Sequence, residues 1–214
     1  MGDSSTVGVL LTDREGSGYH NRVGGIDGFV RLRPTDELRV QYLRSDTRYP
    51  DELAAELGRE PGSFDDDAFT VAYTHQDRNW IWGASYDDRG PDFRADAGFV
   101  PRVDIRILEG AVTRRLWGGE DDRWTTASVT ASAQRTEDHD GDLTDEVVAL
   151  SGNVNGPYQS TLLLGVESTT RSFLGVRYDD QLTGRAFFEI QPTGAARFSL
   201  FARGGESVDF VNNR

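Results

Sequence analysis

The 214-residue chain has no cysteine, one methionine and three histidines. Without cysteine, the chain cannot form disulfides, thiolate metal sites or a cysteine nucleophile. No apolar stretch approaches the ~20 residues that a membrane helix needs, so any contact with a membrane has to be made by strands. The first residues, MGDSSTVGVLL, lack the basic region and apolar run of a signal peptide.

Basic residues are also scarce. The 23 basic residues, all of them arginine, face 36 acidic residues, which gives a net charge of −13. Nucleic-acid binding requires a basic surface, so the sequence argues against a nucleic-acid partner. The same charge balance is ordinary for a bacterial secreted or cell-surface protein. The 24 glycines favour strands and turns over helices.

The segment from Gly90 to Ile107 ends in strict alternation. Val103, Ile105 and Ile107 alternate with Arg102, Asp104 and Arg106. Period-two alternation indicates a β-strand with two different faces. A soluble sandwich buries the apolar face, whereas a membrane barrel exposes that face to lipid and turns the polar face to a wet lumen.

Similar segments, separated by Gly, Pro, Asn and Asp clusters, predict about fourteen strands along the chain. Only Asp51–Leu57 (DELAAEL) looks helical, and we interpret it as one turn of helix inside a long loop. The strands are expected at Thr6–Thr12, Asn21–Arg33, Glu37–Asp46, Ala68–Gln76, Asn79–Asp87, Pro101–Glu109, Ala111–Trp117, Trp124–Thr136, Glu146–Val154, Tyr158–Glu167, Arg171–Asp179, Thr183–Gln191, Ala196–Arg203 and Ser207–Val211.

The predicted connections alternate mostly between long and short. Asp13–His20, Thr47–Asp67 and Asp88–Val100 are long, whereas Gly110 and Ser168–Thr170 are tight. Bacterial outer-membrane barrels have this asymmetry between their two ends. The connection Glu137–Asp145 is the exception, because it is long where a short one is expected. Several strands also approach the ~9–11 residues needed to cross a bilayer, which favours a barrel over a sandwich.

Long cations recur on the polar faces of these strands. In a barrel they would line a hydrated lumen, where they satisfy one another and hold water without taking part in catalysis. In a sandwich the same residues would face solvent. The predicted lumen-facing residues are Arg102, Asp104, Arg106, Arg171 and Arg177.

Four tryptophans lie near predicted strand ends. Trp80 and Trp82 follow a tight turn, and Trp117 and Trp124 flank the loop Gly118–Arg123. In a barrel, tryptophans at strand ends form an aromatic girdle at the membrane interface, and we favour this interpretation. Core packing and a platform that stacks on sugar rings remain alternatives.

The acidic run DHDGDLTDE contains a weak calcium candidate, Asp138, Asp140 and Asp142. Its glycine does not fall where an EF-hand needs it, so a solvated turn is favoured. The histidines His20, His75 and His139 are isolated and lack zinc-site spacing. Neither a nucleophile elbow nor a phosphate-binding loop is found. The sequence therefore predicts no metal site, no cofactor and no catalytic residues.

Three segments carry a resemblance to a known family. NRVGGIDGFVRL (Asn21–Leu32), followed by ELRVQYLRSDT, and above all PDFRADAGFVPRVD resemble the C-terminal domain of large bacterial envelope proteins in domain-of-unknown-function family 5916; the closing FARGGESVDFVNNR is similar too. The resemblance implies an outer-membrane β-barrel in the style of TonB-dependent receptors. Family members often carry an N-terminal module similar to carbohydrate-binding family 9, which this sequence does not contain.

Pattern and resemblance together predict an all-β, antiparallel up-and-down meander of about 12–14 strands, an outer-membrane-type barrel or a large fragment of one. Residues 1–214 are expected to form one domain within a longer barrel, located in the bacterial outer membrane. The expected role is non-enzymatic: a structural wall, a pore or an anchor for a surface or periplasmic module. Expected partners are outer-membrane lipid and the remaining strands of the parent barrel, with carbohydrate bound only through a module outside this chain. The alternatives are a soluble β-sandwich that binds carbohydrate, or part of a polysaccharide-acting envelope protein.

Overall fold

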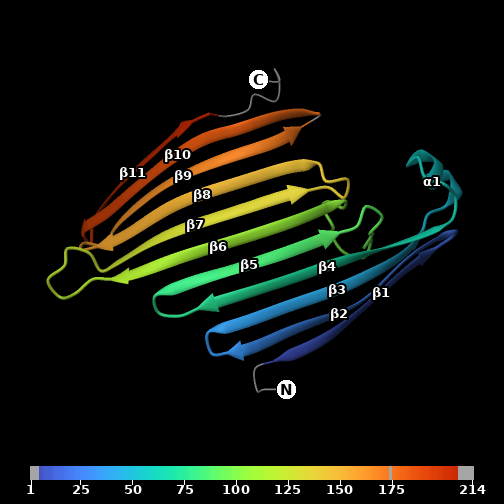
Figure 1. The fold of residues 1–214 in the computed structure, drawn as a ribbon, viewed down its shortest axis with the longest axis horizontal. Helices are drawn as coiled ribbons and strands as arrows, with labels where there is room; N and C mark the ends of the chain where they lie inside the picture. Colours follow the sequence, from blue (N-terminus) through green and yellow to red (C-terminus); the bar gives the residue numbers. More distant parts are fainter. Residues whose placement is uncertain (1–4, 174, 207–214) are drawn as a thin grey trace. The chain divides into compact units, whose positions relative to one another are not determined.

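The computed structural model describes residues 5–173 and 175–206, which form one sheet of eleven strands (Figure 1). Each strand is hydrogen-bonded to the next along the chain, so the spatial order is the order of the sequence. The expected all-β, antiparallel meander is confirmed. The strands are β1 (Thr6–Gly16), β2 (Tyr19–Arg33), β3 (Asp36–Arg48), β4 (Ser63–Gln76), β5 (Trp80–Arg89), β6 (Ile105–Trp117), β7 (Thr126–Glu137), β8 (Leu143–Gly156), β9 (Ser160–Phe173), β10 (Val176–Thr193) and β11 (Ala196–Gly205).

Within residues 5–173 and 175–206 two predicted turns are continuous strand, so this part of the chain forms fewer strands than the sequence predicts. Gly110 lies inside β6, and Ser168–Thr170 lies inside β9. Thr169 pairs with both Val147 and Gln181, so strands on both sides hold this segment extended. The predicted segments 158–167, 171–179 and 183–191 consequently form only β9 and β10. The predicted strand Ser207–Val211 lies outside the described residues.

Two connections also differ from expectation. Asp13–His20, predicted to be long, is mostly strand, and β1 turns into β2 around Gly18, whose positive φ of 67° suits glycine. Glu137–Asp145 shortens to the turn 138–142. Because β6 is a single strand, this turn falls at the same end of the sheet as the long connections 49–62 and 90–104, so it is no longer an exception. The connection 49–62 holds the only helix of the described residues, α1 (Asp51–Glu56), as predicted.

The chain divides into two compact units. The first comprises Met1–Thr74, Ser85–Leu108 and Glu137–Asp142, and the second comprises His75–Ala84, Glu109–Thr136 and Leu143–Arg214. Among the described residues, no helix is long and apolar enough to cross a membrane. The expectation of a single domain over 1–214 stays a prediction.

In the first unit the sheet has two different faces. On β1, β2 and β3 the register aligns Val9 with Ile26 and Ile26 with Tyr42, and it aligns Asp27 with Gln41 on the other face. The apolar side chains are exposed, so no second layer formed by the described residues covers them. The apolar face of the first unit consists of Val7, Val9, Leu11, Ile26, Val30, Leu32, Val40 and Tyr42; its polar face carries Asp27, Arg31, Glu37, Arg39 and Gln41.

The small core of the first unit lies under the connection 90–104. Phe93 is only 2% exposed and packs with Val23 of β2 and Ala68 of β4. Leu43, Ala95, Val100 and Val103 pack around these three. Val23 and Leu43 have the same parity as Asp27 and Gln41, so the loop folds onto the polar side of the sheet.

The second unit repeats the two-faced pattern. Its register aligns Leu150 with Val166, and Leu164 with Ala186, while Asp145 aligns with Arg171 on the other side. The exposed apolar face of the second unit consists of Val148, Leu150, Val154, Leu162, Leu164, Val166, Leu182, Phe188, Phe198 and Leu200.

Candidate functional site

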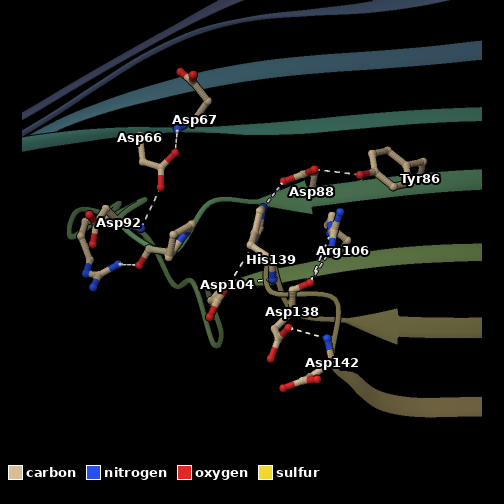
Figure 2. Close-up of polar contacts among 12 residues, drawn as sticks. Asp66, Asp67, Tyr86, Asp88, Asp92, Asp104, Arg106, Asp138, His139 and Asp142 are labelled. Atoms are coloured by element: carbon tan, nitrogen blue, oxygen red, sulfur yellow. Dashed lines mark hydrogen bonds and ion pairs between the residues drawn. The ribbon is translucent and has the colours of Figure 1, made fainter.

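The long-loop end of the first unit gathers a polar cluster around His139 (Figure 2). The imidazole lies between two carboxylates: Nδ1 is 2.9 Å from Asp104 Oδ1, and Nε2 is 2.9 Å from Asp88 Oδ1. The backbone N–H of His139 also donates to Asp104 Oδ1, at 3.1 Å. We call these three residues the His139 clamp. The clamp joins the end of β5, the end of the connection 90–104 and the turn between β7 and β8.

The clamp favours a charged imidazole. Partial burial lowers the pKa of His139, but its hydrogen bonds with Asp88 and Asp104 outweigh burial, and the net pKa is raised above the usual 6.5. The hydrogen bond from the backbone N–H of His139 lowers the pKa of Asp104. An imidazolium donates from both ring nitrogens, which matches a carboxylate on each side.

The turn that carries His139 is also fixed by its own backbone. Arg106 donates to the carbonyl oxygen of Asp138, from Nη2 at 2.7 Å and from Nε at 3.3 Å. Asp138 Oδ1 accepts the N–H of Asp142 at 2.8 Å and so closes the turn. The carboxylate of Asp138, one of the three in the weak calcium candidate, therefore stabilises the turn between β7 and β8. Among residues 5–173 and 175–206, no three His, Asp or Glu side chains are grouped so that they could hold a metal ion.

Buried polar side chains fasten the connection 90–104 to the sheet. Asn21, which is fully buried, donates from Nδ2 to the carbonyl oxygen of Arg94 at 3.0 Å and accepts the N–H of Asp96 at 2.8 Å. Ser45 Oγ accepts the N–H of Arg94 at 3.1 Å. Asp66 Oδ2 accepts the N–H of Asp92 at 2.8 Å (Figure 2). Each of these bonds gives a backbone N–H or carbonyl group of the loop a partner in place of water. The irregular backbone can therefore lie against the sheet without unsatisfied polar groups.

Two tyrosines add to this fastening. The hydroxyl of Tyr19 donates to Asp96 at 2.7 Å, and burial together with this bond raises the pKa of Tyr19 to about 12. Tyr19 also stacks on Tyr49, with ring centroids 6.2 Å apart. The tyrosine therefore stays neutral and remains a hydrogen-bond donor throughout the physiological pH range.

The predicted girdle tryptophans lie in the second unit, at or beside strand ends. Trp80 begins β5 and lies under the guanidinium of Arg114, with 4.8 Å from Cζ to the ring centroid. Trp117 ends β6 and lies under Arg78 at 5.4 Å, and its Nε1 donates to the Arg78 carbonyl oxygen at 3.2 Å. Trp82 stacks on the His75 ring at 5.4 Å. Trp124 lies in the connection 118–125.

The predicted lumen-facing residues do not form one set. Arg102 and Asp104 precede β6, because Asp104 has a positive φ of 57° and the strand begins only at Ile105. Within β6, Arg106 has the parity of the exposed Leu108 and Val112, whereas Ile105 is 3% exposed on the other side.

Arg171 and Arg177 are also separated. Arg171 Nε lies 3.0 Å from Asp145 Oδ1, across from Tyr178. Arg177 instead aligns with Ser172 and pairs with Asp179 at 2.5 Å. The prediction of these five residues rests on local alternation, which does not reveal where a strand starts or where the chain turns.

Sequence reasoning missed the residues that organise the long-loop end. In the sequence His139 is isolated from other candidate ligands, yet its partners Asp88 and Asp104 lie 51 and 35 positions away along the chain. The sequence predicts Asn21 as the first residue of a strand, and nothing near it in the sequence indicates contact with a loop more than 70 residues later. Local spacing carries no signal for such contacts.

No family model, no curated protein and no solved structure matches the chain. The resemblance to domain-of-unknown-function family 5916 therefore stays a prediction, and the geometry alone has to support a function.

Proposed function

We propose that this chain is part of the wall of a bacterial outer-membrane β-barrel, with a non-enzymatic role as wall, pore or anchor. One observation carries the proposal: in each compact unit, one face of the sheet is apolar and is not covered by the described residues, while the opposite face carries ion pairs, Arg31–Glu37 in the first unit and Arg171–Asp145 in the second, with Phe201 as an exposed apolar exception. A soluble protein buries such a face under a second layer. In a barrel the second layer is lipid.

The dimensions of the apolar face support lipid as its cover. On β2, from Gly24 to Leu32, no ionisable side chain points to the apolar side, since Asp27 and Arg31 have the other parity. These nine residues match the ~9–11 that a tilted strand uses to cross a bilayer. On this side of β2, the first charged side chain before the segment is that of Arg22, which forms ion pairs with Asp13 and Glu15.

The polar face has the properties of a wet surface. Arg31 Nη2 lies 2.8 Å from Glu37 Oε1 across the β2–β3 pair. Arg39 reaches the same carboxylate at 3.7 Å and covers the ring of Phe29. Partly exposed pairs of this kind contribute little to stability in water, so they satisfy charge more than they hold the sheet together. They suit the interior of a barrel.

The experiment is cell fractionation followed by gel mobility. The full reading frame that contains this chain is expressed with its own signal, and the outer-membrane fraction is run with and without boiling. We expect the protein in that fraction, with mobility that changes on heating because a closed barrel resists detergent unfolding.

A soluble product whose mobility does not change would contradict the proposal. The soluble β-sandwich alternative would then be tested by sugar binding to the face that carries Trp80 and Trp82.

A further inference from the structure

We infer that the connection 90–104 lies inside the lumen of the barrel and restricts the passage of solutes through it. The inference rests on the proposed function, because only a closed barrel turns the polar face of the sheet into a lumen. It goes further than that proposal, since it selects a pore over a plain wall or anchor and assigns the restriction to one segment.

The connection crosses the sheet from strand to strand. It leaves β5, runs back over β4, β3 and β2 to β1, and returns to the start of β6. Three of its backbone N–H groups, two residues apart, donate to side chains on successive strands: Asp92 to Asp66 of β4 at 2.8 Å (Figure 2), Arg94 to Ser45 of β3 at 3.1 Å, and Asp96 to Asn21 of β2 at 2.8 Å. Arg14 of β1 then donates to the carbonyl oxygen of Asp96 at 3.0 Å. The four strands are neighbours in the sheet, so the segment covers three inter-strand steps, about 14 Å.

The connection lies on the polar face of the first unit. Val23, which packs on Phe93, has the same parity as Asp27 of the polar face. The exposed apolar side chains of the same strands, such as Ile26 and Tyr42, have the other parity. If lipid covers the apolar face, the connection is therefore on the inside of the barrel.

The sheet holds the connection through buried polar side chains. Asn21, Ser45 and Thr47 are fully buried, on a face that water would reach if the connection lay elsewhere. Thr47 Oγ1 accepts from Asn21 Nδ2 at 2.8 Å, and the Asn21 amide also bonds Arg94 and Asp96. Removing the connection from the sheet would break these bonds and expose Phe93. Such an arrangement favours a fixed segment over a flap that opens and closes.

A segment fixed across the inside of a barrel has a direct consequence for transport. Loops that fold into the lumen plug a barrel, and the diameter of a pore together with the groups that line it decides what passes. The side of the connection turned away from the core is exposed at Ala97, Gly98 and Phe99. The ion pair Arg31–Glu37 lies on the same face of the sheet. The solutes that the segment restricts are therefore water-soluble.

The test measures ion conductance in planar lipid bilayers, with the complete protein expressed from its full reading frame. One variant replaces residues 92–102 by two glycines, which keeps β5 joined to β6 and removes the crossing segment. The second is Ala97→Cys, which places a thiol on the exposed part of the connection. The chain has no cysteine of its own, so a charged, water-soluble methanethiosulfonate reagent modifies the chain only there. The matched control is Val9→Cys on the exposed apolar face of β1, and wild type treated with the reagent is the baseline.

We expect the deletion to raise the conductance at least about twofold, or to open a channel that is silent in wild type. The reagent should lower the conductance of Ala97→Cys and leave that of Val9→Cys unchanged, because the Val9 position faces lipid. The cysteine pair decides the outcome if the deletion variant does not fold.

Equal conductance of wild type and the deletion, with no effect of the reagent on Ala97→Cys, would overturn this inference and leave the proposed function intact. No channel in wild type or in any variant whose gel mobility still changes on heating would do the same. A wild-type protein whose mobility does not change on heating would overturn the proposed function, and the inference with it.

Discussion

At the residue scale, single polar side chains decide how the loops lie. His139 joins three segments because each ring nitrogen has its own carboxylate, and Asn21 holds two backbone groups of the connection 90–104. Neither role follows from residue type alone. Both side chains act on partners distant in sequence, so only the folded sheet brings them together.

The His139 clamp predicts a pH-dependent stability. Since the folded-state pKa of His139 lies above 6.5, its contribution is complete below about pH 6.5 and is lost as pH rises through the folded-state pKa. Asp104 acts in the opposite direction: its lowered pKa adds stability above about pH 3.8, which is lost as pH falls through the folded-state value. Urea unfolding from pH 5 to 9 should show the first loss in wild type, and His139→Gln should remove it.

The matched control replaces His20, a histidine whose ring lies near one carboxylate where that of His139 lies between two. His20 Nε2 lies 3.2 Å from Asp46 Oδ2 and forms no ion pair with a second carboxylate of the described residues, so His20→Gln should leave the His139-dependent slope in place. An unchanged slope in His139→Gln would show that other groups cause the pH dependence.

Replacing Asn21 should lower the stability of the protein, because two backbone groups of the connection 90–104 would lose their hydrogen-bond partner. Asn21→Ala leaves the carbonyl oxygen of Arg94 and the N–H of Asp96 without their partner in a buried place, and we expect a loss of about 1–3 kcal/mol in the free energy of unfolding. The control is Asn79→Ala, because no side-chain hydrogen bond of Asn79 is found among the described residues. Equal effects of the two variants would mean that the loop is held without Asn21.

At the element scale, the sequence predicts strands well and turns less well. Alternation locates nearly every strand, and the short helix is found from DELAAEL. The predicted turns at Gly110 and Ser168–Thr170 are wrong because residue preference is local, whereas neighbouring strands hold these residues extended. Conversely, the strand predicted to start at Pro101 starts only at Ile105, because Pro101 has no N–H to donate to a neighbouring strand and the chain turns at Asp104.

Two glycines of β2 provide a test at this scale. A Cβ at Gly25 would lie 2.2 Å from Leu43 Cδ2 and 2.7 Å from the carbonyl oxygen of Tyr42, whereas a Cβ at Gly28 would meet nothing within 4 Å. Gly25→Ala should therefore lower the free energy of unfolding by about 1–3 kcal/mol. Gly28→Ala should be neutral or stabilising by about 0.4–1 kcal/mol, because it restricts the unfolded chain. Equilibrium urea unfolding compares them, and equal effects would contradict the β2–β3 packing.

At the scale of the whole molecule, the alternation of apolar and polar residues is realised as two faces in each unit. The sequence predicts the faces but not what covers them, because lipid and a second protein layer require the same pattern. It also cannot predict which loops fold onto the sheet. That depends on Phe93 finding Val23 and Ala68, a contact between segments far apart in the chain.

The most direct test of the proposed function inserts a charge on one face and then on the other. Ile26 and Gln41 lie on adjacent strands and opposite faces, and Ile26 is 58% exposed. The measurement is the free energy of unfolding of the full chain in phospholipid vesicles. We predict that Ile26→Arg lowers it by about 2–4 kcal/mol, because the arginine enters lipid, and that Gln41→Arg changes it little. Small and equal effects would mean that both faces meet water, and would contradict the membrane-wall account.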